Sequence, residues 1–273
     1  MKSSAKKSQR VLTAIDTAVF AAAAAIFSLC ILYVAVSMIL GKPSPIYGYG
    51  AYDAYELIQR IGALLLVMVP FIMRKCRVML PSAFTIAYNV FILISVFGGT
   101  FMGLYINTSW WDKFNHLLSG VLLGLAGMFF LNALTAGKSK VNAGGVLLYA
   151  VAFAVLCGVI WEIYEFTCDG LLGSNMQKFR NDHTLEEYVG RAALKDTMTD
   201  LILDSAGALA AGAFCAAANS VNGNFLRMFE IKILPAAEEI PAINDAKTGH
   251  TQPESAMDEA AATDAAESGT VPD

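Results

Sequence analysis

The first long apolar run, residues 17–41, reads TAVFAAAAAIFSLCILYVAVSMILG and contains 25 residues without an ionised side chain. A membrane-spanning helix needs about 20 predominantly apolar residues, so this run is long enough to cross a bilayer. The hydrophobic region of a signal peptide covers only about 7 to 15 residues. We therefore interpret the run as an uncleaved first membrane helix that follows a basic N-terminal segment, residues 1–12.

Further apolar runs predict five more membrane helices. Stretches without ionised residues cover 78–111, 114–137, 141–161 and 205–226. The run 61–73 is shorter and contains Pro70, but it can cross if 57–60 complete the helix and Arg60 snorkels to the interface. Within a membrane domain at 13–220, we expect helices at about 13–40, 57–74, 82–106, 112–136, 143–166 and 196–219.

The composition agrees with a membrane protein. Of 273 residues, 56% are hydrophobic and only 15% are charged, whereas soluble domains are about 25% charged. No basic stripe with interleaved aromatic residues is visible, which argues against binding of nucleic acid. The expected fold is therefore all-α, a polytopic membrane protein with six transmembrane helices in a lipid bilayer.

The distribution of lysine and arginine predicts the orientation. The short connections at 74–77 and 138–140 are rich in basic residues and directly adjoin helix ends, and such loops are normally cytoplasmic. We expect a multi-pass protein of the bacterial plasma (inner) membrane with both termini in the cytoplasm. Residues 235–273 are acidic and poor in large apolar residues, so we expect a disordered cytoplasmic tail.

Three groups of ionisable residues at helix ends are the candidate functional residues. Charge near hydrocarbon is costly and is usually retained for a partner or a task. Within two of the groups, residues four apart share one face of their helix. The groups are Asp112 with His116, Glu162 with Glu165, and Asp196 with Asp200 and Asp204.

The predicted topology places these three groups on the same, outer side of the membrane. The helix faces below them carry small residues, which allow helices to approach closely: Gly120, Gly124, Gly158 and Ala208. We therefore expect six or seven carboxylate and imidazole groups to converge in one outward-facing pocket. The candidate metal ligands are Asp112, His116, Glu162, Glu165, Asp196 and Asp200.

Like charges in such a pocket cannot all stay ionised, so protons or a cation must compensate them. Carboxylate oxygens with one imidazole suit a divalent cation, with Mg²⁺ or Mn²⁺ favoured over Zn²⁺ or Fe²⁺. Such an ion could activate water or polarise a phosphoryl group of a lipid-linked substrate. Alternatively, protonated carboxyl groups could form a proton relay or a general acid–base pair.

Individual members of the groups also have simpler explanations. Asp112 and Asp196 lie in the first turn of their helices, where aspartate stabilises free N–H groups and the helix dipole. Glu162 and Glu165 could reach water by snorkelling, and His116 could be a hydrogen-bonded core histidine. Asp200 and Asp204 lie too deep in their helix to be caps, so they are the hardest of these residues to explain in this way.

The loop at 167–195 contains His183 and a run, 184–195, in which apolar and charged residues alternate in a helix-like pattern. This pattern predicts a helix that lies in the membrane interface. His183 could serve as a further ligand, since it lies on the same side of the membrane as the pocket.

Together, these residues resemble the YjdF-like family of bacterial inner-membrane proteins over about 50–215. The resemblance rests on Asp112-Lys113 with His116, Trp161-Glu162 with Glu165, and Asp196-Thr197 with Asp200 before Gly207-Ala208. The chain is more loosely similar to VanZ-like proteins, some of which are associated with glycopeptide resistance. Where their pattern has asparagine and glutamine, this chain has Asp200 or Asp204 and Glu165, which favours the YjdF-like resemblance. That resemblance implies a polytopic membrane fold without an established activity.

Three functions fit these observations. The first is a metal-dependent site that acts on a lipid-linked or envelope substrate. The second is a cation- or proton-coupled transporter, although the inner halves of the last three helices are almost purely apolar. The third is a non-catalytic membrane partner protein in which the acidic residues only hydrogen-bond the bundle together.

Overall fold

The computed structural model describes residues 2–44, 52, 54–135 and 141–233. Within them the chain is mostly helical, at 79%, with almost no sheet, which confirms the all-α expectation. Six segments are long and apolar enough to span a membrane. These segments are Lys7–Ile39, Ala54–Lys75, Ser82–Phe101, Trp111–Leu134, Ala143–Leu172 and Lys195–Val221. The acidic segment 235–273 lies outside the described residues, so its disorder stays a prediction.

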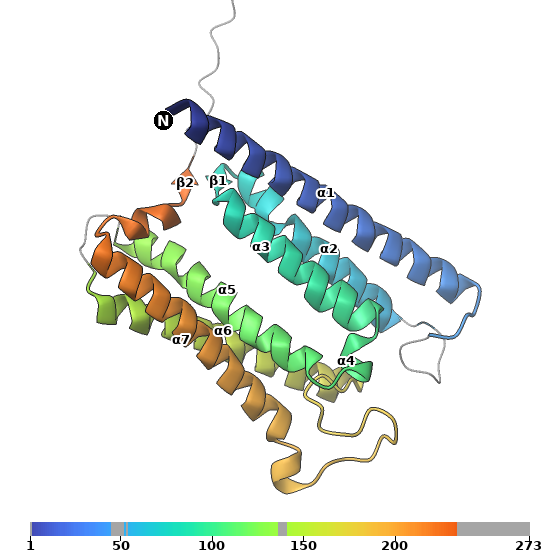
Figure 1. Ribbon diagram of the computed structural model, residues 1–273. Coiled ribbons are helices and arrows are strands. Elements are labelled where there is room, and N and C mark those ends of the chain that lie inside the picture. Colours follow the sequence, from blue (N-terminus) through green and yellow to red (C-terminus); the bar gives the residue numbers. More distant parts are fainter. Residues whose placement is uncertain (1, 45–51, 53, 136–140, 234–273) are drawn as a thin grey trace, which may run out of the picture. The chain divides into compact units, whose positions relative to one another are not determined.

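The first three spans pack together as one group (Figure 1). They comprise α1 (Lys2–Ile39), α2 (Ala54–Lys75) and α3 (Ser82–Ile92). Their shared core contains small and large apolar side chains: Ala23, Phe27, Ala63, Val67 and Ile92.

The third span is not the single helix expected over 82–106. α3 continues into a π-helix, η1 (Leu93–Phe101), and a short helix, α4 (Leu104–Asn107), follows. Gly103, between them, has φ 72°, a left-handed conformation that glycine adopts readily because it lacks a Cβ atom. The chain changes direction there, and α4 contacts both η1 and α5.

Pro70 lies inside α2, where proline cannot donate a backbone hydrogen bond to the carbonyl of Leu66. The hydroxyl group of Tyr88 in α3 donates to that carbonyl oxygen at 3.0 Å. A neighbouring helix therefore supplies the donor that proline lacks, as is typical of proline in membrane helices.

The last three spans form a second group: α5 (Trp111–Leu134), α6 (Ala143–Leu172) and α7 (Lys195–Val221). The side chain of Asn142 caps the start of α6 by accepting from the N–H of Gly145 at 2.7 Å. At the opposite end from the predicted pocket, an apolar cluster fills the interior, with Met128, Val146 and Cys215 fully buried. The 3₁₀-helix η3 (Phe225–Phe229) packs against this cluster.

Glycine residues allow α5 and α7 to approach closely. A Cβ atom on Gly120 would lie 2.2 Å from the carbonyl oxygen of Asp204, and one on Gly207 would lie 2.2 Å from that of Leu117. Neither position can accommodate a larger residue unless the two helices move apart. The small residues thus set the helix separation at the level of the candidate site.

Two short strands join the groups at the end where α2 and α5 finish (Figure 1). β1 (Val78–Met79) pairs antiparallel with β2 (Lys232–Ile233), with Val78 opposite Ile233. Nearby, the rings of Phe84 and Phe129 pack edge to face, with their centroids 4.8 Å apart.

The predicted interfacial helix at 184–195 is wrong. The loop instead contains an isolated antiparallel bridge between Arg180 and Glu187 and a single 3₁₀ turn, η2 (Gly190–Ala192). The Asn181 side chain accepts from the backbone N–H groups of His183 and Thr184, which favours a turn over a helix.

We expect Gly120→Ala to destabilise the protein by about 1–3 kcal/mol, because the new methyl group would overlap the backbone of α7. The measurement is unfolding of the detergent-purified chain in increasing sodium dodecyl sulfate. Gly62→Ala in α2 is the matched control, since its Cβ atom would meet nothing within 4 Å. Equal stability of both variants would contradict the close approach of α5 and α7.

Candidate functional site

The candidate site lies where α5 and α7 begin and α6 ends. Asp112 occupies the first turn of α5 and Asp196 the first turn of α7. One turn and two turns deeper in α7, Asp200 and Asp204 are buried. The structure therefore brings the first and third of the sequence groups together, although they come from helices more than 80 residues apart in the chain.

Lys113 is the centre of the ionic contacts in the site. Its Nζ atom donates to Asp112 Oδ2 at 3.0 Å, to Asp196 Oδ1 at 2.5 Å and to Asp200 Oδ1 at 2.8 Å. A single ammonium group thus bridges carboxylates from two helices. The sequence analysis noted Lys113 only as part of a motif and did not include it among the site residues.

The ring of His116 lies between the carboxylates of Asp112 and Asp200 and the more deeply placed Asp204. Its Nδ1 atom lies 3.3 Å from Asp204 Oδ2. Its Nε2 atom lies 3.7 Å from Asp112 Oδ1 and 3.9 Å from Asp200 Oδ2. Because an ionised carboxylate only accepts, Nδ1 donates to Asp204. Nε2 faces Asp112 and Asp200 either as a second N–H donor or, with a cation between them, as a ligand.

Asp204 is itself held firmly. Ser119 donates its hydroxyl proton to Asp204 Oδ1 at 2.6 Å. Gly158 of α6 leaves room for the other oxygen, since a Cβ atom there would lie 2.7 Å from Asp204 Oδ2. A carboxylate that orients the second nitrogen of a histidine is the usual support of a metal-ligating imidazole.

Asp112, His116 and Asp200 could hold a metal ion. Each offers one ligand atom, and these atoms all lie within 4.8 Å of one another. With metal–ligand bonds of about 2.1 Å, two ligands of one ion lie up to about 4.2 Å apart. The two His116 distances fall within this limit, but Asp200 Oδ2 also accepts from Lys113 at 2.9 Å. A bound ion would therefore draw the carboxylates closer together and displace the ammonium group of Lys113 from that oxygen.

The two glutamates of α6 lie beside this trio and are buried. Glu165 Oε1 accepts from the indole N–H of Trp161 at 2.7 Å. Glu162 Oε2 accepts from the side-chain amide of Gln177 at 3.0 Å, and that amide also donates to Thr197 of α7. Glu162 Oε1 has no hydrogen-bond partner among the described residues.

The first helix group contributes Tyr105 of α4 to the surroundings of the site, which the sequence analysis missed. Its hydroxyl group is hydrogen-bonded to Ser95 at 2.9 Å. Burial raises the pKa of Tyr105 above its ordinary value; the Ser95 bond acts in the opposite direction, and the nearby carboxylates, including Asp112 and Asp200, raise it further. The phenol of Tyr105 is therefore protonated, and either Tyr105 or Ser95 donates in their hydrogen bond.

Gly99 makes room for the ring of Tyr105, because a Cβ atom on it would lie 2.1 Å from that ring. The sequence signal for this contact was the pair Gly98-Gly99 inside an apolar span. The predicted further ligand His183 is exposed in the loop and is not part of the Asp112, His116 and Asp200 trio.

Comparisons with known proteins agree with a membrane protein. An uncharacterized protein of Thermotoga maritima is 33% identical over 111 residues, and the match covers 40% of this chain and 49% of the relative. The chain therefore spans about half the length of this relative. No solved structure matches the sequence.

A family model described as "Predicted membrane protein (DUF2238)" matches residues 25–220, a range that contains every candidate site residue. This match is consistent with the YjdF-like resemblance, whereas neither comparison supports the looser VanZ-like one. Because the matched range covers well over half of the sequence, the chain belongs to the DUF2238 family of predicted membrane proteins.

Proposed function

We propose that the cluster binds a divalent cation and acts with it on a lipid-linked, phosphoryl-containing substrate at the outer surface of a bacterial inner membrane. The observation that carries this proposal is the geometry of His116. Its Nε2 atom faces two carboxylates while its Nδ1 atom is held by a third. This is the arrangement of a metal-binding histidine with its supporting carboxylate.

The charge balance of the site supports a cation. Six carboxyl groups lie at this end of α5, α6 and α7: Asp112, Glu162, Glu165, Asp196, Asp200 and Asp204. Within the described residues, Lys113 and His116 contact these carboxylates, and Lys178 lies near Asp196 while it is paired with Asp182. Two ammonium groups and one imidazole cannot balance six ionised carboxylates in a buried site, so protons or a metal ion must compensate the remainder.

The ligand atoms favour a hard or borderline cation. Carboxylate oxygens suit Mg²⁺ and Mn²⁺, and the imidazole nitrogen favours Mn²⁺ over Mg²⁺ and also admits Zn²⁺. When bound, such an ion supplies Lewis acidity toward water or a phosphoryl oxygen. Glu162 is the candidate proton acceptor, because its Oε1 atom is buried without a partner among the described residues.

The position of the cluster favours a substrate that enters from the membrane surface. The residues lie at helix ends, where a polar headgroup meets hydrocarbon. The far end of the same three helices is closed by the buried apolar cluster around Met128, Val146 and Cys215. This closed end favours a surface enzyme over a transporter, which would need a polar path through the bundle.

The orientation completes the proposal. The connections at 74–77 and 138–140 are basic, and such loops favour the cytoplasmic side, with both termini there. This topology places the start of α5, the end of α6 and the start of α7 on the outer side.

We expect His116→Ala and Asp200→Asn each to lower the affinity for Mn²⁺ at least tenfold, because each removes one of three ligands. Asp204→Asn, which removes the carboxylate that orients His116, should lower the affinity about 10- to 100-fold. Calorimetric titration of the detergent-purified protein, with elemental analysis, measures both effects. His183→Ala is the matched control, since this histidine is exposed in the loop. Unchanged metal content in the three site variants would contradict the proposal.

Lys113→Met separates a metal site from a purely structural ion network. The ammonium group competes with a cation for Asp112, Asp196 and Asp200. We therefore expect the variant to be less stable without metal and to gain about 2.7 kcal/mol when Mn²⁺ reaches 100 times its dissociation constant for the variant. The unchanged protein should gain less at the same Mn²⁺ concentration. A variant that is destabilised and is not rescued by any divalent cation would instead support a structural role.

The orientation can be tested with Cys76, the exposed one of the five cysteines. A membrane-impermeant maleimide should label Cys76 only after the cells are opened. In a Cys76→Ser background, which is also the control for specificity, Arg191→Cys in the loop before α7 should be labelled in intact cells. The reverse pattern would place the site in the cytoplasm.

A further inference from the structure

A second polar site lies within the first helix group, away from the carboxylate cluster. It is a cavity of about 140 Å³ between α1, α2 and α3, near the end where β1 begins. Its polar lining comes from Asp16, Thr17, Arg74 and Asn89. This volume is large enough for several water molecules or for part of a small ligand.

The amide of Asn89 is the polar group of this cavity that lacks a hydrogen-bond partner among the described residues. Its side chain is completely buried, with 0% exposure. Neither Oδ1 nor Nδ2 has a hydrogen-bond partner among the described residues. Burial of an unpaired amide is unfavourable, and such groups in native structures are normally satisfied by a ligand or by ordered water. The amide offers one acceptor and two donors to whatever fills the cavity.

The carboxylate of Asp16 in the cavity does not need a bound cation, because its negative charge is already compensated. Its Oδ2 atom accepts from Arg74 at 2.8 Å, and its Oδ1 atom accepts from the hydroxyl of Thr85 at 2.6 Å. Thr85 lies in the first turn of α3, where the helix dipole also favours negative charge. The side chain of Arg74 remains 40% exposed, so its guanidinium group can contact a second anion.

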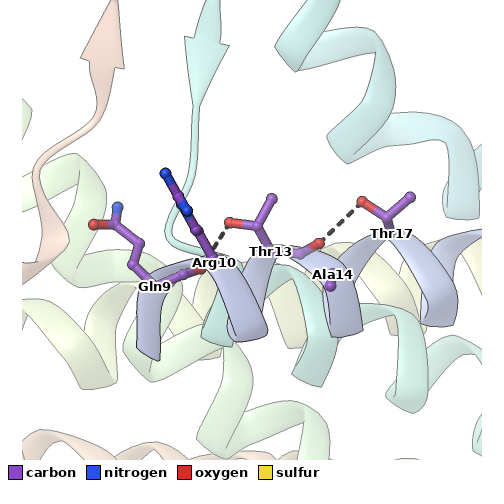
Figure 2. Close-up of a pocket in the computed structure, with 5 residues that line it drawn as sticks. All are labelled: Gln9, Arg10, Thr13, Ala14 and Thr17. Carbon is purple, nitrogen blue, oxygen red and sulfur yellow. Dashed lines mark hydrogen bonds between the residues drawn. The ribbon is translucent and has the colours of Figure 1, made fainter. Parts of the chain in front are cut away.

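A shallow, open groove lies along α1, and Thr17 lines both this groove and the cavity. Figure 2 shows Gln9, Arg10, Thr13 and Thr17 along this part of α1. The two threonines donate their hydroxyl protons to carbonyl groups one turn earlier in the helix. Arg10 has no ion-pair partner in the described part of the chain, so the groove adds an uncompensated positive charge.

The remaining wall is apolar. The rings of Phe20 and Phe71 stack with their centroids 5.4 Å apart, and Pro70 lies beside them. Lys75, whose Nζ atom lies 5.5 Å from the centroid of the Phe71 ring, adds another positive charge at this end of α2. The site thus combines basic groups, a buried amide and an aromatic wall at the ends of membrane-spanning helices.

We propose that this cavity and groove bind the headgroup of an anionic phospholipid. Its phosphodiester group lies between Arg10 and Arg74, and polar atoms of its headgroup satisfy the amide of Asn89. Its acyl chain follows the wall formed by Phe20 and Phe71. Basic pockets between membrane helices are suited to such headgroups. This proposal does not depend on a metal in the carboxylate cluster.

The full-length protein is placed in nanodiscs that contain equal amounts of phosphatidylcholine and phosphatidylglycerol and is then purified from them. Native mass spectrometry measures which lipid the protein retains. We expect phosphatidylglycerol to be retained preferentially. Asn89→Leu should reduce that preference about tenfold, because the headgroup loses hydrogen bonds in a buried site. Arg10→Gln should reduce the preference for phosphatidylglycerol about fivefold, because one basic residue near the membrane surface contributes about that much to the attraction of an anionic lipid.

Arg191→Gln is the matched control, because this exposed arginine lies in the loop before α7, outside the cavity and groove. If Asn89→Leu and Arg10→Gln retain as much phosphatidylglycerol as the control, the proposal is overturned and water fills the cavity. Titration with soluble glycerol 3-phosphate distinguishes the source of the phosphate. Competition at micromolar concentrations would overturn the assignment to a lipid, whereas no competition supports it.

Discussion

The ion pairs of Lys113 are the interaction on which the second helix group depends. Its ammonium group stands among carboxylates of α5 and α7, in surroundings where an uncompensated charge costs several kcal/mol. The close approach of α5 and α7 at Gly120 and Gly207 forces these charges together. Packing and charge compensation are therefore coupled: helices that meet at this distance need positive charge or protons among these carboxylates, and Lys113 supplies part of it.

Much of the fold could be predicted because the thickness of a bilayer fixes the length of each apolar run. The spacing of Asp196, Asp200 and Asp204 likewise placed them on one face of a helix, as α7 shows. The role of Lys113 could not be predicted in this way. A lysine at a helix end normally extends to water. The side chain of Lys113 points toward α7 instead, and that direction depends on where α7 lies in the folded protein.

The remaining differences arise from local backbone chemistry. The left-handed Gly103 follows the end of the third span and brings Tyr105 toward the carboxylates. The turn at Asn181 replaces the expected interfacial helix. In both places a single residue with a turn preference outweighs the hydrophobic pattern around it. The sequence analysis grouped Asp204 with the acidic residues, but its role in orienting His116 became visible only from the contacts.

The hydrogen bond from Tyr88 to the carbonyl of Leu66 has a consequence for the mobility of the first helix group. Most backbone carbonyls in a membrane helix are satisfied within their own helix, so neighbouring helices can slide past one another without exposing them. Here, an axial shift of α3 against α2 would move the hydroxyl group of Tyr88 away from the carbonyl of Leu66. That carbonyl would then lie in hydrocarbon without a donor, because no water is present there to replace the phenol. Pro70, through the hydrogen bond that it leaves to Tyr88, therefore fixes the axial position of α3 against α2.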